Sequence, residues 1–294
     1  MFERVKRAAF ARLAPASWYV RSIYKQKTGV PLNLENPVTF NEKIQWLKLN
    51  YRNPILTRMA DKIESKEVVR EILGSDRSVP TAAIFDSYDS IRLDGLPIAL
   101  ALKATHGSGW NIISRDKEQL DEQAVRDYFR FWLGKSYYLY SKEWAYKHIR
   151  PRVICESLLL DKSGELPLDY KVYCFSGRAE CILVINRHSA KKKWSYDSSW
   201  NKLPFSIDSP VPDEECPRPI RLAEMLHISE SLSAGLPFLR VDFFLVDDAL
   251  YVGELTAYPA NGMGIFTDEA WNRKLGEMLE LPSRQEIAAK VFGR

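Results

Sequence analysis

The hydrophobic and polar positions of the chain alternate between helical and strand periods, and no internal repeat is visible. Thr39 and Glu42 have the spacing of a helix capping box, and apolar residues follow them at about the helical period. A second helix is predicted to begin at Asp61 and to end at Gly74, because glycine readily takes the left-handed conformation of a helix C-cap. We therefore expect two helices before the first strand.

Strand patterns begin with two segments that are predicted to be buried strands, residues 81–85 and 97–103. The glycine-containing loop 105–109 separates the second segment from a further strand over 110–113. The remaining expected elements are helices over 117–133 and 141–149, a strand over 152–158, a hairpin of 169–175 with 179–185, a proline-rich loop over 204–219, a helix over 220–234, and helices from about 268 and 283. This mixture favours an α/β or α+β architecture.

The last expected hairpin consists of residues 238–246 and 250–255, and one of its faces is wholly apolar. That face follows alternate residues from Leu239 to Leu245. Alternate residues of a strand point to the same side of a sheet, so this face is predicted to lie in the core.

Two carboxylates meet on the same hairpin if residues 247–249 form a three-residue loop, because that register places Asp242 directly opposite Glu254. Paired like charges destabilise a sheet, so a bound cation or a strong cationic neighbour is expected beside them. Oxygen ligands suit Mg²⁺, which completes its shell with phosphate and water. A two-residue turn at Asp247 and Asp248 would instead place the two carboxylates on opposite faces.

The composition is that of a folded protein of about two domains, with 294 residues, of which 46% are hydrophobic and 27% charged. The four cysteines have neither C-x-x-C spacing nor histidines at metal-ligand spacing, which argues against a zinc site or a disulfide framework. No apolar run is long enough to span a bilayer or to form a signal peptide. We therefore expect a cytoplasmic protein with reduced thiols.

The net charge of +4 comes from the N-terminus, because residues 1–30 contain seven basic side chains and one acidic side chain. The rest of the chain is slightly acidic, so no nucleic-acid partner is expected. Within this basic arm, Phe2, Val5, Ala9 and Leu13 recur near helical spacing, a pattern compatible with contact to the inner face of an anionic membrane. The alternative is a helix that packs on the body of the protein.

Two lysines are candidates for binding an anion. Lys103 ends an apolar strand just before loop 105–109, which would bring an ammonium group and loop amides to a phosphate. Lys171 shares a strand face with Asp169. The alternatives are a solvated strand end and a surface ion pair. The chain lacks both the G-x-S-x-G elbow and the P-loop signature, which argues against a serine hydrolase and a P-loop enzyme.

Taken in order, these residues resemble the ATP-grasp superfamily. Three longer segments, residues 37–47, 169–177 and 253–259, resemble motifs of its TupA-like branch, which is linked to teichuronopeptide and other surface-polysaccharide biosynthesis. The resemblance implies an α+β ATP-grasp fold, in which two α+β lobes clasp the nucleotide. The implied division is a basic arm over 1–30, a helical segment over 31–80, a small lobe with a glycine-rich lid over 81–158, and a large lobe with the Mg-binding hairpin over 159–294.

The resemblance also implies roles for single residues. The implied nucleotide-binding residues are Lys62, Lys103, His106, Gly107, Ser108, Gly109, Glu156 and Lys171, with a ribose carboxylate at Asp161 or Glu165. Arg240 and Lys171 are the implied catalytic residues, while Asp242 and Glu254 would hold Mg²⁺, with Mn²⁺ as an alternative. Thr256 stands where many members have an asparagine, so a third metal ligand is not assigned, and Thr256 is instead a candidate substrate contact.

The implied activity is an ATP-dependent ligation of a carboxylate to an amine through an acyl phosphate. A uronic acid of a surface polysaccharide, or its precursor, is the expected carboxylate, and an amino acid or small amine is the expected partner. A phosphotransferase on a small molecule or glycan is the first alternative, and a glycosyltransferase is the second. Residues 186–196, with Arg187 and Trp194, are a candidate acceptor-binding loop because aromatic faces suit sugar rings; a solvated loop is the alternative.

Overall fold

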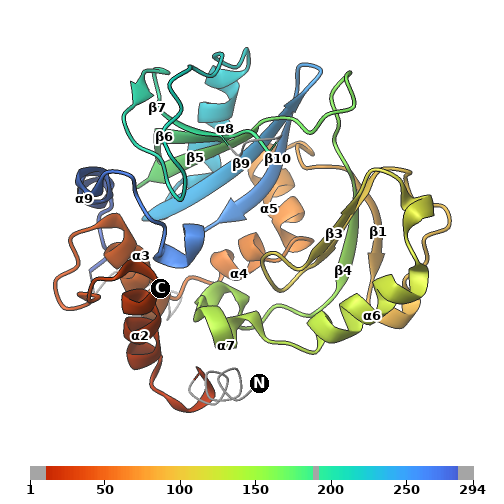
Figure 1. The fold of residues 1–294 in the computed structure, drawn as a ribbon, viewed down its shortest axis with the longest axis horizontal. Coiled ribbons are helices and arrows are strands. Elements are labelled where there is room, and N and C mark those ends of the chain that lie inside the picture. Colours follow the sequence, from red (N-terminus) through yellow and green to blue (C-terminus); the bar gives the residue numbers. More distant parts are fainter. Residues whose placement is uncertain (1–10, 188–191, 284–294) are drawn as a thin grey trace.

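The computed structural model describes residues 11–187 and 192–283 and arranges them as two α+β lobes, each built on an antiparallel sheet (Figure 1). The predicted α+β class is therefore confirmed. Three parts of the predictions lie outside the described residues: the first ten residues of the basic arm, residues 188–191 of the candidate acceptor loop, and the helix expected from about residue 283.

Four helices precede the first strand in the described part of the chain, instead of the two that were expected: α2 (Ala16–Thr28), α3 (Phe40–Asn50), α4 (Ile55–Ala60) and α5 (Glu64–Leu73). The capping box of Thr39 and the left-handed C-cap of Gly74 are confirmed. The helix predicted from Asp61 begins three residues later, because Asp61 ends α4 and its carboxylate accepts a hydrogen bond from the Ile63 amide at 2.9 Å. No helix among the described residues is long and apolar enough to cross a membrane.

The small sheet has the order β1-β4-β2-β3 and consists of β1 (Thr81–Phe85), β2 (Leu100–Ala104), β3 (Asn111–Ser114) and β4 (Val153–Ser157). Helix α6 (Glu122–Leu133) packs on this sheet through Val125 and Phe129. The prediction that residues 81–85 are buried is wrong, because β1 is an edge strand whose side chains are largely exposed.

The segment between α6 and β4 contains no long helix, so the helix predicted over 141–149 is wrong. It holds α7 (Tyr137–Ser141) and the 3-10 turn η3 (Trp144–Tyr146). Lys142 separates them because its φ of 59° is left-handed and ends α7. Two further 3-10 turns, η1 (Tyr88–Ser90) and η2 (Lys117–Gln119), flank the small sheet, and η2 occupies the start of the helix predicted from residue 117.

The large sheet has the order β10-β9-β5-β6-β7-β8 and consists of β5 (Asp169–Phe175), β6 (Arg178–Ile185), β7 (Lys193–Asp197), β8 (Lys202–Leu203), β9 (Phe238–Val246) and β10 (Ala249–Thr256). Helix α8 (Leu222–Ser233) packs against β5, β6 and β9. Leu239, Val241 and Phe243 are fully buried, which confirms the predicted core face. The 3-10 turn η4 (Pro259–Gly262) and helix α9 (Glu269–Met278) follow the sheet.

The hairpin of β9 and β10 pairs the two carboxylates as predicted, but its turn length and its register differ from the prediction. Its turn has two residues, Asp247 and Asp248, so the expected three-residue loop is wrong. A bulge at Gly253 then shifts the register by one residue between Val252 and Glu254. Asp242 therefore lies opposite Glu254 after all, and the two acids share one face of the sheet.

Candidate functional site

A cavity of about 410 Å³ lies between the two sheets. Side chains from both lobes line it, and many of them are charged. The lining residues that bear on chemistry are Lys62, Lys66, Lys103, Ser108, Gly109, Glu156, Asp169, Lys171, Arg187, Asp242 and Glu254. The fold thus brings most of the predicted site residues to one place, although they come from segments almost 200 residues apart.

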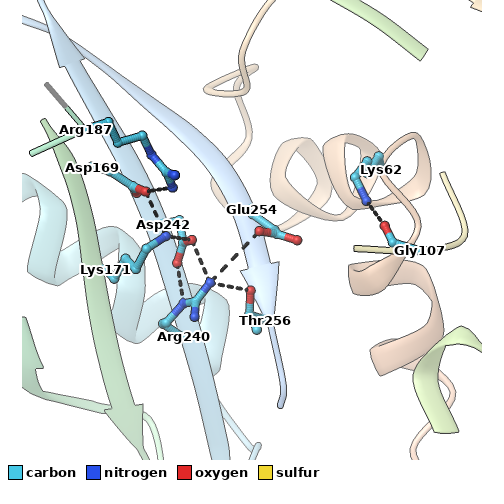
Figure 2. Close-up of polar contacts among 9 residues, drawn as sticks. All are labelled: Lys62, Gly107, Asp169, Lys171, Arg187, Arg240, Asp242, Glu254 and Thr256. Atoms are coloured by element: carbon cyan, nitrogen blue, oxygen red, sulfur yellow. Dashed lines mark hydrogen bonds and ion pairs between the residues drawn. The ribbon is translucent and has the colours of Figure 1, made fainter. Parts of the chain in front are cut away.

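The carboxylate of Asp242 is held by two cations on the large sheet (Figure 2). Arg240 donates to it through Nε at 2.6 Å and through its terminal nitrogen at 2.8 Å, and Lys171 donates to it as well. Arg240 also donates to the Thr256 hydroxyl at 3.1 Å and lies 4.0 Å from a carboxylate oxygen of Glu254. In this state the strong cationic neighbour expected beside the two acids is provided by the chain itself.

Asp169 extends this network and was not predicted as a site residue. Its Oδ2 accepts from Lys171 at 2.9 Å and from Arg187 at 2.6 Å, while its buried Oδ1 has no hydrogen-bond partner. Burial alone would raise the pKa of Asp169, but Lys171 and Arg187 outweigh it and hold this pKa below its ordinary value. The ion pair of Asp169 with Lys171 is buried on the cavity wall, so the interpretation as a surface pair is wrong.

The opposite wall carries a second charged cluster around Glu156, whose side chain is 4% exposed. Lys66 and Lys103 each bind one of its carboxylate oxygens at 2.5 Å. Burial would raise the pKa of Glu156, but the two lysines outweigh it and lower this pKa. Lys66 was also missed by sequence reasoning, although its position four residues after Lys62 was a usable signal.

The loop between β2 and β3 is tied to the N-terminal helices by Lys62, which donates to the carbonyl oxygen of Gly107 at 2.6 Å (Figure 2). Burial lowers the pKa of Lys62, and the nearby charge of Glu254 acts in the opposite direction. Gly107 has no room for a side chain, because an added Cβ would lie 2.4 Å from Trp110. Ser108 and Gly109 follow it and line the cavity.

Two of the predicted nucleotide-binding residues, His106 and Asp161, lie away from the cavity lining. His106 is buried against Trp110, with ring centroids 5.1 Å apart, and its Nε2 lies 3.1 Å from the Lys135 carbonyl oxygen. Asp161 Oδ1 accepts from the amides of Ser163 and Glu165 within its own turn. These contacts give both side chains a structural role in this state.

Trp194 is a core residue, so its prediction as an exposed sugar platform is wrong. Its side chain is buried on β7, and its indole N–H donates to the Glu214 carbonyl oxygen at 2.8 Å. Arg187, from the same predicted segment, is half exposed and lines the cavity.

The acids of the β9–β10 hairpin fit a divalent cation of the hard, oxygen-binding kind. Glu254 is 40% exposed at the cavity, and Asp242 lies opposite it with carboxylate oxygens only. Within residues 11–187 and 192–283, no group of three or more His, Cys, Asp or Glu side chains is placed to hold a metal. The oxygen donors of Asp242 and Glu254 suit Mg²⁺ bound by two carboxylates, with phosphate and water as the other ligands.

A family model described as TupA-like ATP-grasp matches residues 42–280. A search of curated proteins finds no match.

Solved structures with a similar fold include three ligases or synthetases. D-alanine–D-alanine ligase from Bacillus anthracis is 19% identical, with a TM-score of 0.49, and the match covers 86% of this chain and 76% of that one. The ATP-grasp ligase PsnB with a precursor peptide is 14% identical, with a TM-score of 0.39 and coverage of 74% and 56%. N5-carboxyaminoimidazole synthetase from Staphylococcus aureus is 15% identical, with a TM-score of 0.40 and coverage of 74% and 50%.

Proposed function

Because the chain belongs to the TupA-like ATP-grasp family, we propose that it is an ATP- and Mg²⁺-dependent ligase that joins the carboxylate of a uronic acid to an amine. Family membership confirms the predicted ATP-grasp fold and the ligase class. The reaction partners are inferred from the site and from the family resemblance.

One observation carries the proposal most directly: the bulged register that pairs Asp242 with Glu254 at the wall of a cavity rich in lysines. Two acids suited to Mg²⁺ and several ammonium groups around one cavity are the parts that phosphoryl transfer needs, since its catalysis is mainly positioning and charge stabilisation. Bound Mg²⁺ would supply charge neutralisation on the phosphate oxygens.

Several lysines of the cavity are held by acids in this state. Lys103 is bound to Glu156, and Lys171 is bound to Asp169 and Asp242. We infer that ATP phosphates replace part of these contacts on binding, so that the same ammonium groups offset the charge of the triphosphate. The network therefore keeps the cations positioned before the nucleotide arrives.

The proposed reaction has two steps. The γ-phosphoryl group of ATP moves to the substrate carboxylate and gives an acyl phosphate and ADP. The amine then attacks the acyl carbon, and phosphate leaves as the amide forms. Arg240, which binds Asp242 and lies 4.0 Å from Glu254, is the proposed group that stabilises the negative oxygen of the tetrahedral intermediate.

The uronic acid is proposed from the resemblance to the TupA-like branch, with the amine an amino acid or small amine. Arg187 supports an anionic acceptor, because its guanidinium is half exposed at the cavity. Asp169 neutralises it only in part, since Lys171 shares the same carboxylate oxygen.

The test is a reaction of the protein with Mg-ATP, D-glucuronate or a glucuronate-containing glycan, and pooled amino acids. We expect ADP, phosphate and an amide product by mass spectrometry. A stable phosphorylated sugar would instead identify a kinase. Thermal stabilisation by UDP-sugars but not by ATP would contradict the proposal and favour a glycosyltransferase.

A further inference from the structure

A second cavity of about 390 Å³, the outer pocket, lies next to the main cavity between the two sheets. Three parts of the chain line it: the segment before β1, the start of α8 and the turn between β9 and β10. Its lining consists of Asp76, Arg77, Arg221, Glu224 and residues 247–251. Within the described part of the chain, the two cavities share no lining residue. The outer pocket is therefore separate from the proposed ligation site.

Two arginines converge on one carboxylate in the outer pocket. A terminal nitrogen of Arg77 lies 3.2 Å from Glu224 Oε1, and one of Arg221 lies 3.3 Å from Glu224 Oε2. Arg221 also donates through Nε to the carbonyl oxygen of Asp248 at 3.0 Å. The two arginine side chains are 43% and 48% exposed. A carboxylate that enters the pocket can therefore take the place of Glu224 between them.

The charges of the outer pocket favour a ligand that carries both signs. The exposed turn residues Asp247 and Asp248 line it. Together with Asp76 and Glu224 they outnumber the two arginines, so a simple anion is repelled, and a simple cation leaves the arginines without a ligand group. A free amino acid has a carboxylate for the arginines and an ammonium group for the acids. The ring of Tyr251 suits its carbon atoms.

Successive residues of the same two segments line the outer pocket and the main cavity. The outer pocket takes residues 76–77 and 249–251, and the main cavity takes residues 78–79 and 252–255. Two backbone hydrogen bonds join the segments at this boundary. The Val252 amide donates to the Arg77 carbonyl oxygen at 2.7 Å, and the Val79 amide donates to the Val252 carbonyl oxygen at 3.3 Å. A shift of Arg77 is therefore passed to β10 two residues before Glu254.

Val79 connects the same segment to the charged cluster around Glu156. The carbonyl oxygen of Val79 accepts a hydrogen bond from Lys66 at 2.5 Å, and Lys66 also binds Glu156 at 2.5 Å. All three residues line the main cavity. Direct contacts thus run from the outer pocket to both walls of the main cavity.

We propose that the outer pocket is a regulatory site that binds a free amino acid and thereby strengthens nucleotide binding in the main cavity. The carboxylate of the amino acid replaces Glu224 on Arg77 and Arg221, and its ammonium group binds the released Glu224 and the acids of the turn. The bound amino acid then holds segment 76–79 against α8 and the β9–β10 turn. This inference goes beyond the proposed function, because it concerns a second site and involves no chemical step.

Calorimetric titration of the full chain with each common amino acid, without nucleotide, tests the site. Acetate and methylammonium are titrated as probes that carry one charge each. We expect at least one amino acid to bind about tenfold or more tightly than either probe, because it uses both kinds of group. Arg77→Gln and Arg221→Gln should each weaken this binding by about tenfold or more. The matched control is Arg218→Gln, since Arg218 is exposed and lies outside the pocket lining; it should change the affinity by less than about twofold.

Regulation is measured with Mg-AMPPNP, an analogue of Mg-ATP that is not hydrolysed. A saturating amino acid should tighten the binding of Mg-AMPPNP by about fivefold or more. Mg-AMPPNP should tighten the binding of the amino acid by the same factor, because the coupling of two binding sites is reciprocal. Arg77→Gln should lose this coupling.

Three results would overturn the site: no binding by any amino acid, binding no tighter than that of acetate or methylammonium, or wild-type affinity in both arginine variants. The last result is the behaviour of an amino acid that binds only as the amine substrate in the main cavity. Binding in the outer pocket without any effect on Mg-AMPPNP would overturn the regulatory role. None of these measurements involves ligation, so the proposed ligase function is tested separately by its own products.

Discussion

At the scale of single residues, the two acids of the β9–β10 hairpin differ in environment although they lie opposite each other. Asp242 is buried and bound by Arg240 and Lys171, whereas Glu254 is 40% exposed at the cavity. The charges of Lys62 and Arg240 lower the pKa of Glu254, because they outweigh the effect of its partial burial. Glu254 is therefore the accessible acid with a lowered pKa, whereas burial raises the pKa of Asp242 in spite of the charges of Arg240 and Lys171.

This difference predicts two separate outcomes of neutralising the acids. Glu254→Gln should abolish ligation but change the free energy of unfolding by no more than about 0.5 kcal/mol, because few contacts are lost. Asp242→Asn should abolish ligation and also destabilise the fold by about 3 kcal/mol, because it removes the buried carboxylate that Arg240 and Lys171 share. Chemical denaturation and ADP release measure the two effects. Retained ligation in either variant would contradict the assignment of these acids.

At the scale of elements, the sequence patterns identified the main strands. They also predicted the pairing of Asp242 with Glu254, but from a three-residue loop, whereas the turn has two residues. The pairing survives because the bulge at Gly253 adds back the residue that the shorter turn removes. A bulge leaves no periodic signal in the sequence, so neither the shorter turn nor the bulge that compensates for it was visible in the pattern. The site roles of Asp169 and Lys66 were missed for another reason. Their ion pairs are buried by segments remote in sequence, and the local pattern does not show which segments face each other.

The bulge depends on a glycine, which makes it testable. A Cβ on Gly253 would lie 2.7 Å from the Phe244 ring, which is too close for both groups to keep their places. Gly253→Ala should therefore cost about 1–3 kcal/mol of unfolding free energy and weaken Mg-ATP binding. Gly134→Ala is the matched control, because its nearest neighbour atom lies 3.6 Å away and its φ is not left-handed. Unchanged stability and binding in Gly253→Ala would show that the bulge does not set the register.

Helix α2 refines the expectation for the basic arm. Tyr19, Val20 and Tyr24 are buried against the body, so the alternative of a packed helix holds for this part of the arm. Leu13 and Trp18 remain exposed beside basic residues. An exposed tryptophan and leucine in a basic segment are the features of a peripheral membrane contact.

We propose that this surface binds anionic lipid. The double variant Leu13→Ser, Trp18→Ser should lose most of its co-sedimentation with vesicles that contain phosphatidylserine, while ATP binding is unchanged. Salt should weaken the wild-type binding, because the attraction of basic residues to an anionic surface is screened. Equal binding of wild type and double variant would remove the proposal.

At the scale of the whole molecule, two lobes place charged groups of both signs around one reaction centre. The small lobe and the N-terminal helices contribute Lys62, Lys66, Lys103 and Glu156, and the large lobe contributes the paired acids together with Lys171 and Arg187. The order of these residues along the chain was sufficient to indicate the superfamily. The ion pairs that hold them could not be predicted, because these pairs depend on contacts between segments that are remote in sequence.

The ligase function requires that the substrate carboxylate be activated as an acyl phosphate, and oxygen labelling follows that step directly. D-glucuronate labelled with ¹⁸O in its carboxylate is incubated with the protein, Mg-ATP and pooled amino acids, and the released phosphate is analysed by mass spectrometry. We predict that each phosphate released with the amide carries one ¹⁸O atom from the carboxylate. Amide formation with unlabelled phosphate, or label in AMP instead of phosphate, would contradict the proposed chemistry.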